Sequence, residues 1–507
     1  MNRTLPDPKP WLGDLALPAS LSADGTYVYR IYDLSFRPRL NHVPSGLHVN
    51  QRTTNPATHR HQGHHGPDNG RGTWEIAGAD IEILDGEIAG IGPSLDAPGA
   101  DVIDGSNTIT LPGFVDSHWH IWGTLLRGVV GDGPDHGWFA TKGRLGGHFT
   151  SDDFATGVRL GMAEGISAGV TTVHDWSHNI MCYEDAEANV AVHRELGTRV
   201  HFSYSAPSAH PSMPMEKMRE ILAKGGVLPD AVMDFDNPRR IAEEWVPSSE
   251  DLLTVGVAVR GPARSTPEVY REEWRLAREQ GLTISMHCAG TEAEVERIRQ
   301  VEVLESDGLL GDDMLLAHCL YISPIEREHL ASHSIPISMS PLAELRLGMG
   351  APPINEHIAA GVSVSLSLDT TAISATADVF QAMRVAVGLQ SIATKTATAL
   401  TPRRVLEMTT IDGARALGLE EVVGSLSIGK RADLIMIRTD QLNMAPVRDP
   451  AVAVVHSAQP SNVDTVMIDG RILKWKGELT TVDVPTVISE ADDSLRRLCE
   501  RAGFVPG

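Results

Sequence analysis

The stretch "LPGFVDSHWHIWGTLLRG", residues 111–128, places two histidines, His118 and His120, at the end of an apolar run. Residues 113–120 have the composition of a buried strand. Side chains two positions apart on a strand point to the same face, so both imidazoles are expected to face one way. Two explanations are open for this pair: ligands of a metal ion, or hydrogen-bonded histidines packed in a core.

Short β-branched runs alternate with helical patterns from about residue 112 onward. A helical stretch such as "PEVYREEWRLAREQG" separates two of these runs. The eight candidate strands are "GFVDSHWH", "GVTTVHDW", "RVHFSYS", "LLTVGVAVR", "LTISMH", "MLLAHC", "PISMSP" and "SVSLSLD". Eight such alternations predict an α/β fold with a parallel (β/α)8 barrel of the TIM type, spanning residues 112–423.

Both ends of the chain carry hairpin signals. The turn Asp85-Gly86 lies between two strand patterns near the N-terminus, and Asp469-Gly470 does the same near the C-terminus. We expect the two ends, residues 1–111 and 424–479, to form one small β-domain beside the barrel. Residues 480–507 are expected to be a terminal helix or tail. The N-terminal part contains a His-rich insert near residues 40–74, interpreted as a loop or disordered segment.

Composition restricts the partners of the protein. The 507-residue chain has a formal net charge of −23, which disfavours nucleic acid. No apolar run reaches the roughly 20 residues that cross a bilayer, and the first residues lack the apolar core of a signal peptide. The four cysteines form no C-x-x-C pair and fit reduced thiols. We therefore expect a cytoplasmic protein that binds a small molecule and no membrane, and that assembles as a homodimer or homotetramer.

Three further barrel strands end in a residue that can bind metal. Strand five ends in His287, strand six in His318 and strand eight in Asp369. The carboxyl ends of barrel strands meet at one rim, so these residues are expected to face His118 and His120. This combination favours a metal site over core packing. Imidazoles and a carboxylate suit one divalent ion, Zn²⁺ first, with Fe²⁺ or Mn²⁺ as alternatives.

Each of these residues has a predicted role. His118, His120 and His287 would bind the metal, and Asp369 would bind the metal or its water and act as general base. His318 would stabilise the charge that develops in a tetrahedral intermediate. Strand four ends at Arg260, with no lysine to carry a bridging carboxylate. A single metal ion is therefore expected.

These residues resemble the amidohydrolase superfamily from about residue 78 to about residue 477. The resemblance rests on "LPGFVDSHWH", "SMH", "LLAHC", "SLSLD" and "GSLSIGKRADL". The nearest branch is the one that contains cytosine- and guanine-deaminase-like enzymes and triazine hydrolases. The resemblance implies a barrel enzyme with four metal ligands and one catalytic histidine, namely His118, His120, His287, Asp369 and His318 respectively.

One position departs from that branch. Its deaminases carry a glutamate three residues after the strand-five histidine, where it moves a proton onto the substrate ring. This chain has Gly290 there, and the nearest acids are Glu292 and Glu294. Because glycine has no side chain that can donate a proton, Gly290 predicts that ring substrates are deaminated poorly. Glu292, on a longer loop, is a candidate replacement.

Residues around the rim are candidate substrate contacts. The tryptophans Trp119, Trp122 and Trp176 could form an aromatic pocket, with core packing as the alternative. His178 could touch substrate or relay a proton, with a structural role as the alternative. Glu344 lies in the glycine-containing stretch after strand seven that resembles a substrate loop.

The sequence as a whole predicts a mononuclear metal-dependent hydrolase. Its substrate is expected to be a small cyclic or aromatic molecule, cleaved at a non-peptide C–N bond. A metal-dependent lyase or decarboxylase on the same barrel is the alternative, favoured by the missing acid at Gly290. A non-catalytic binding or structural barrel is a second alternative, weakened by the presence of all five rim residues.

Overall fold

Eight parallel strands form the central sheet of the computed structural model, which describes residues 28–32, 78–131, 133, 135–205, 232–248 and 251–505. The strands follow one another in sequence order, and each pairs in parallel with the next. They are β6 (Phe114–Trp119), β7 (Val170–Ser177), β8 (Arg199–Tyr204), β9 (Leu253–Val259), β10 (Thr283–Cys288), β11 (Met314–His318), β12 (Ile337–Met339) and β13 (Val364–Leu366).

The first and last strands meet and close the sheet into a barrel. A parallel bridge joins Trp119 to Asp369, just beyond the end of β13. The amide of Asp369 donates to the carbonyl of His118 at 2.9 Å. The predicted eight-stranded parallel barrel is confirmed.

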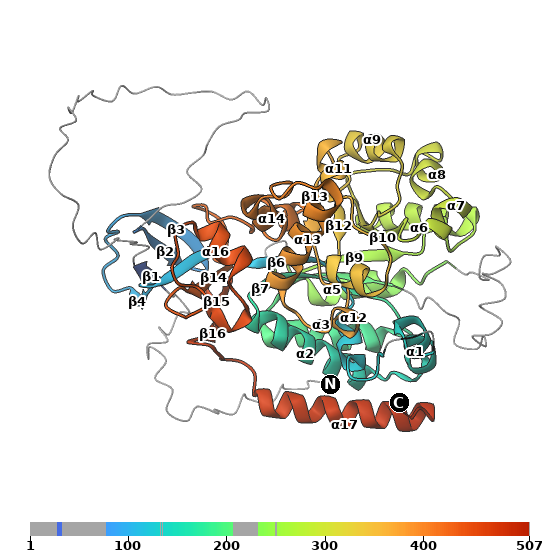
Figure 1. Cartoon of the computed structure of the whole chain (residues 1–507). Coiled ribbons are helices and arrows are strands. Elements are labelled where there is room, and N and C mark those ends of the chain that lie inside the picture. The colour runs from blue at the N-terminus through green and yellow to red at the C-terminus, as the bar shows by residue number, and fades with distance from the viewer. Residues whose placement is uncertain are drawn as a thin grey trace.

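Helices surround the barrel and connect its strands (Figure 1). The connecting helices are α2 (Ser151–Ser167), α3 (Tyr183–Leu196), α5 (Asp236–Trp245), α6 (Pro267–Glu279), α7 (Glu292–Arg297), α8 (Gln300–Ser306), α9 (Pro324–Ser332), α10 (Pro341–Arg346) and α11 (Ile354–Ala359). Four helices follow β13: α12 (Thr371–Ser374), α13 (Val379–Thr394), α14 (Pro402–Met408) and α15 (Ile411–Ala416). A reciprocal capping box between Thr150 and Asp153 begins α2, because it satisfies amides that the first turn leaves unpaired.

The segment after β6 forms part of the barrel mouth. It contains the 3₁₀ helix η1 (Ile121–Leu126), the helix α1 (Trp138–Leu145) and the short 3₁₀ helix η2 (Gly146–His148). The residues of η1 are buried and pack on α2. This packing fixes the chain directly after the His-x-His motif.

Two small sheets lie beside the barrel (Figure 1). The first sheet contains β1 (Val28–Tyr32), β2 (Asp80–Leu84), β3 (Glu87–Gly92) and β4 (Asp101–Asp104). The second is antiparallel and contains β5 (Thr108–Pro112), β14 (Leu434–Arg438), β15 (Val463–Ile468), β16 (Arg471–Trp475) and β17 (Glu478–Leu479). Both chain ends thus contribute to this β-domain, as predicted, since β5 pairs with β14.

The tips of the two predicted hairpins pack against each other. Asp85 and Asp469 both have positive φ, as do the glycines that follow them. A Cβ atom on Gly470 would lie 2.6 Å from the Cα of Gly86, so this close approach requires glycine. The position of the domain boundaries stays a prediction, and the His-rich segment of residues 40–74 lies outside the described residues.

A buried ion pair connects the barrel to the β-domain. Arg199, the first residue of β8, donates to both carboxylate oxygens of Asp433 at 2.9 and 3.0 Å. Both side chains are almost fully buried, and the bidentate geometry is the strongest form of such a pair. This contact fixes the β-domain to the amino-terminal end of the barrel strands.

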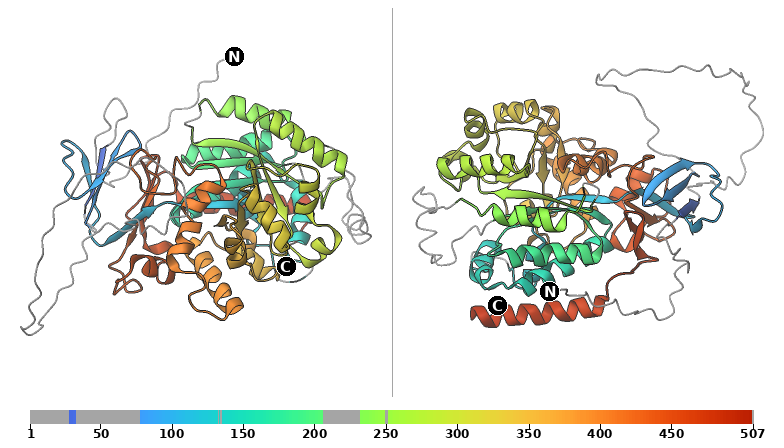
Figure 2. Two further views of the ribbon diagram at one scale, coloured as in Figure 1. Left: turned by 90° about the horizontal axis from the view of Figure 1, so that it is seen from above. Right: turned by 180° about the vertical axis from the view of Figure 1, so that it is seen from behind.

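The chain ends in a long helix, α17 (Val484–Ala502), which lies along α2 (Figures 1 and 2). The remaining helices, α16 (Pro450–His456) and η3 (Pro460–Asn462), lie between β14 and β15. Within the described residues, no helix combines the length and apolar character needed to cross a membrane.

Candidate metal centre

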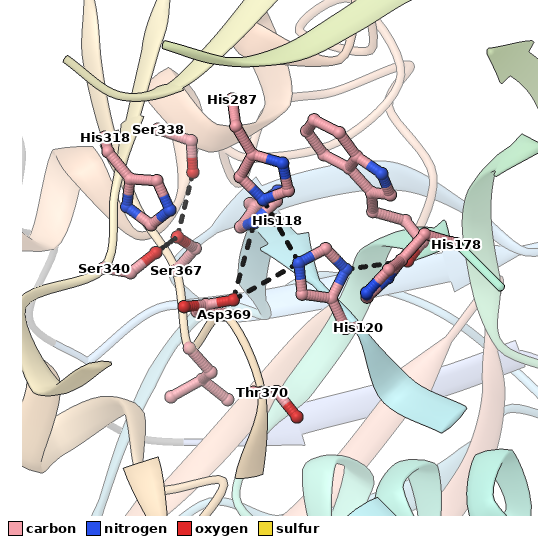
Figure 3. Close-up of polar contacts among 12 residues, drawn as sticks. His118, His120, His178, His287, His318, Ser338, Ser340, Ser367, Asp369 and Thr370 are labelled. Carbon is pink, nitrogen blue, oxygen red and sulfur yellow. Dashed lines mark hydrogen bonds and ion pairs between the residues drawn. The ribbon is translucent and has the colours of Figure 1, made fainter. Parts of the chain in front are cut away.

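Three histidines from two barrel strands converge at the carboxyl end of the barrel (Figure 3). One ring nitrogen from each of His118, His120 and His287 lies within 4.8 Å of the other two. The Nε2 atoms of His120 and His287 are 3.2 Å apart. Asp369 completes the group, because its Oδ1 lies 3.6 Å from Nε2 of His118 and 3.4 Å from Nε2 of His120.

The donor set fits a divalent metal ion. His118 is fully buried, and neither of its ring nitrogens has a hydrogen-bond partner among the described residues. Such buried unpaired polar atoms are rare unless a ligand satisfies them. Burial holds the pKa of His118, His120 and His287 well below the ordinary value, so each ring is neutral and has a lone pair to offer.

The orientation of His120 is set by the main chain. Its Nδ1 donates to the carbonyl oxygen of Trp176 at 2.9 Å, which leaves the lone pair on Nε2. This Nε2 faces His287 and Asp369. Histidines that bind metal usually have their second nitrogen held in this way.

Asp369 is held by the chain that closes the barrel. Its own φ is 62°, in the left-handed region, and its carbonyl accepts from the amide of His120. Burial raises the pKa of its carboxyl to about 6, against the opposing effect of the positive charges of His318 and Lys142. A carboxyl group of that pKa can take up and release a proton near neutral pH.

Asp116 supports the site from behind, a role that sequence reasoning missed. Its carboxylate accepts from the amide of His118 and from the amide of Leu368, each at 3.0 Å. It therefore connects β6 to the chain just before Asp369. Burial raises the pKa of Asp116 well above the ordinary value. The only signal in the sequence was an acid inside an otherwise apolar strand.

His318, at the end of β11, lies beside the three-histidine group. Its ring is nearly parallel to that of His287, with 5.5 Å between centroids. Its Nδ1 lies 3.1 Å from Oε1 of Glu344. Burial lowers the pKa of His318, but the hydrogen bond to Glu344 and the charges of Asp369 and Glu344 outweigh it, so the pKa is raised. Glu344 thus lies behind His318.

The candidate aromatic residues have different positions. Trp176 stacks on His287 with 4.1 Å between ring centroids and forms one wall of the site. Trp122 donates through Nε1 to Nδ1 of His178 at 3.4 Å, and the His178 ring is 4.1 Å from that of His120. Trp119 is fully buried against α2, where its ring meets Gly165, so it lies outside the barrel and away from the site. Alternation along β6 explains this, because Trp119 stands between two inward-facing histidines.

The loop after β10 contains no acid directed at the site. A Cβ atom on Gly290 would lie 2.9 Å from Cε of Met349 and 4.0 Å from the ring of His318. Glu294 points elsewhere, because its Oε1 accepts from the amide of Ala289 and from Gln300. Glu292 is exposed at the start of α7.

One basic residue near the rim acts on the site, and a second one points away from it. Lys142 of α1 was missed by sequence reasoning, yet its charge acts on Asp369, His120 and His178. Burial lowers its pKa to about 7. Arg260 follows β9 and points to Glu273 of α6 at 3.4 Å.

In the part of the chain that the structure describes, one group of metal-binding side chains is found, the three histidines. All four cysteines are free.

Residues 109–473 match the amidohydrolase family. The chain belongs to this family. It is 31% identical over 436 residues to a 5'-deoxyadenosine deaminase of Methanothermobacter thermautotrophicus, with 83% of this chain and 95% of the relative covered. It is 28% identical over 432 residues to a 5-methylthioadenosine/S-adenosylhomocysteine deaminase of Desulforudis audaxviator, with the same shares covered.

Solved structures share the fold. An adenosine deaminase of Xanthomonas campestris with bound zinc has a TM-score of 0.72 at 22% identity, covering 84% of this chain and 94% of the other. The atrazine chlorohydrolase TrzN of Arthrobacter aurescens with zinc has a TM-score of 0.74 at 21% identity, covering 83% and 96%.

Family membership and the histidine group together define the class of enzyme. The chain is a metal-dependent hydrolase of the amidohydrolase type, which acts on non-peptide C–N bonds of small molecules. The predicted family, fold and reaction class are confirmed.

Proposed function

We propose that the chain is a mononuclear zinc hydrolase that removes an amine or amide nitrogen from a small cyclic or aromatic substrate. In this proposal His118, His120 and His287 bind the ion together with Asp369. The observation that carries it is the buried convergence of three neutral imidazole nitrogens beside one carboxylate. Zinc is preferred to Fe²⁺ or Mn²⁺ because two structural neighbours contain it and nitrogen-rich sites suit it.

The chemistry divides between the ion and the protein. A zinc ion in this site would supply a water that is acidic enough to act as a nucleophile near neutral pH. Asp369 would accept the proton and pass it to the departing nitrogen. His318 would donate a hydrogen bond to the charge that develops on the substrate. Trp176 and His178 would form the wall of the substrate site on the side of β7.

The substrate class follows from the relatives and from Gly290. The relatives' names point to amino groups on nitrogen heterocycles. However, the described loop after β10 directs no acid toward His318, where a ring nitrogen would need a proton. We therefore favour substrates whose leaving nitrogen or carbonyl can be served by Asp369 and His318 alone, such as cyclic amides and N-acyl compounds.

A substrate screen tests the proposal. The zinc-loaded protein would be assayed against amides, N-acyl compounds and heterocyclic amines, including 5'-deoxyadenosine and atrazine, with metal content measured in parallel. We expect one zinc per chain and turnover within one substrate class, and both should be lost in His118→Ala. Turnover that persists in the metal-free variant would refute the assignment.

Gly290 also supports a second candidate, a metal-dependent lyase or decarboxylase. The lack of an acid beside the substrate ring matters less in a reaction that adds no water. Product analysis in H₂¹⁸O separates the two, because only hydrolysis transfers solvent oxygen to the product. The cytoplasmic location and the assembly into two or four copies stay predictions.

A further inference from the structure

Glu344 is a carboxylate buried in the protein interior, and packing alone does not offset the free energy that its burial costs. It has no solvent exposure. Its Oε1 accepts from the amide of Ser340 at 2.9 Å and from Nδ1 of His318 at 3.1 Å. Its Oε2 has no hydrogen-bond partner among the described residues. A carboxylate half-satisfied in the interior is destabilising, so its presence indicates a use other than stability.

The contact with Glu344 determines the state of His318. A carboxylate oxygen can only accept, so Nδ1 of His318 carries the hydrogen of that bond. The opposite ring nitrogen, Nε2, is then left for the reacting centre, and it donates the hydrogen bond assigned to His318 above only when the ring carries a hydrogen on both nitrogens. The His318 ring lies 5.7 Å from that of His118 and 5.5 Å from that of His287. A rotation of this ring would therefore change what it presents to a substrate bound at the three histidines.

We propose that Glu344 is a positioning residue: it fixes the tautomer and orientation of the His318 imidazole for the hydrolysis proposed above, on which this inference rests. It acts through His318 and does not itself touch the substrate. Among the described residues, Glu344 is the only carboxylate within hydrogen-bond distance of the His318 ring. The sequence had suggested a substrate contact for Glu344 instead.

The start of α10 is held firmly enough for this role. The hydroxyl of Ser340 bonds to that of Ser367 at 2.7 Å, and Ser367 accepts from Ser338 at 2.9 Å (Figure 3). Ser338 in turn bonds to Ser117 on β6 at 2.7 Å. This chain of buried hydroxyls ties the amide donor of Glu344 to the barrel wall. Residues that position a catalytic group must themselves be fixed, and these are.

The end of α10 also fills the space in front of Gly290. The amide of Met349 donates to the carbonyl of Glu344 at 2.9 Å, and the Met349 carbonyl accepts from the hydroxyl of Tyr321. Met349 is thereby held with its methyl group 2.9 Å from where a Cβ on Gly290 would stand. One turn thus provides the carboxylate behind His318 and places the Met349 methyl group in front of Gly290.

Two variants test the inference, with a matched control. Glu344→Ala removes the acceptor, whereas Glu344→Gln keeps an oxygen that can accept from Nδ1. Glu326→Gln is the control, because this buried carboxylate also has one unpaired oxygen but bonds to Ser323 and Arg299. All proteins would be zinc-loaded. The first readout needs no substrate: ¹⁵N-histidine NMR, with the His318 signals assigned by their loss in His318→Asn.

We expect the Nδ1–H form of His318 in the wild type, in Glu344→Gln and in the control, and its loss in Glu344→Ala. Zinc content should stay at the wild-type value in all of them. An unchanged His318 signal in Glu344→Ala would overturn the inference. This result would leave the proposed hydrolase function untouched.

The second readout is turnover of the compound that the wild type hydrolyses fastest in the screen. We expect kcat to fall about 10²-fold in Glu344→Ala with KM nearly unchanged, and Glu344→Gln to recover part of it. A raised KM with unchanged kcat would instead make Glu344 a substrate contact and refute the positioning role. If the wild type hydrolyses nothing in the panel, the proposed function fails, and the NMR result still decides the role of Glu344.

Discussion

Asp369 donates its backbone amide to the carbonyl of His118 at 2.9 Å, and its carboxylate lies 3.6 Å from Nε2 of the same histidine. The pair belongs to the two strands that close the barrel. The candidate metal centre is therefore built on the closing seam itself. A change at this seam acts on the fold and on the site together, and the predictions below separate the two effects.

His118→Ala should bind zinc at least about tenfold more weakly and show no turnover, while remaining folded. The free energy of unfolding of the metal-free protein should fall less than in the control below, because truncation of His118 leaves a cavity but breaks no hydrogen bond of its ring. Zinc titration and urea unfolding measure the two effects.

The matched control is His174→Ala. This buried histidine bonds to the carbonyl of Ser117 and to the hydroxyl of Ser203, each at 2.8 Å. Its loss should lower the free energy of unfolding by about 2–4 kcal/mol and leave zinc binding near normal. Unchanged zinc affinity in His118→Ala would remove this histidine from the metal site.

Asp369→Asn should lower kcat by about 10² or more, since asparagine keeps the shape but cannot take up the proton. Zinc content should fall less than in His118→Ala. A suitable control is Asp449→Asn, because Asp449 caps α16 far from the site and asparagine caps a helix equally well. Steady-state kinetics decide the point, and near-normal kcat would show that another group is the base.

The free bases cytosine, guanine, isocytosine and 8-oxoguanine should be poor substrates. Their deamination needs a proton on a ring nitrogen, and residue 290 is a glycine, which has no acid to supply it. Without that proton the intermediate keeps its negative charge in a water-poor site. Ammonia release would be measured for each base. A kcat/KM of about 10⁴ M⁻¹s⁻¹ or more for any of them would contradict the argument.

Acid should destabilise the metal-free protein partly through His201. Burial, and next the charge of His174, lower the pKa of His201 to about 3. Below about pH 6.5 the imidazole of His201 binds a proton in the unfolded chain but stays neutral in the folded protein. The free energy of unfolding therefore falls as the pH drops towards 3. The slope for one such group is at most about 1.4 kcal/mol per pH unit.

Urea unfolding at pH 7.5 and 5.0 tests this expectation. The loss of stability between the two pH values should be smaller in His201→Gln than in the wild type, by about 1–2 kcal/mol. The exposed His456→Gln serves as the control. Equal losses in all three proteins would mean that His201 can be protonated without unfolding.

Strand ends were the part of the site that the sequence could predict. Each of His118, His287, His318 and Asp369 lies at or just beyond the carboxyl end of a predicted strand, and a parallel barrel brings all such ends to one rim. The barrel order needed no long-range information, because consecutive strands pair. Alternation along β6 also predicts that Trp119 faces away from the histidines, although the residue type suggested an aromatic pocket.

Contacts between distant loops could not be predicted. Glu344 contacts His318 because α10 lies next to the end of β11. No spacing in the sequence predicts how this helix is oriented relative to that strand. Asp116 reaches Leu368 only after the barrel has closed. Lys142 comes near the site through the path of the segment after β6, whose residues show no strand or helix period that would place it.

The pairing of β5 with β14 has a consequence for synthesis of the protein on the ribosome. The residues between Pro112 and Leu434 must be made before β5 can meet its partner, which takes roughly 15–65 s at about 5–20 residues per second. Until then β5, the strand that leads directly into the His-x-His motif, lacks its one partner strand, so both of its edges can pair with other chains. A nascent chain stopped short of Leu434 would therefore aggregate more readily than the complete protein, however much of its barrel had already formed.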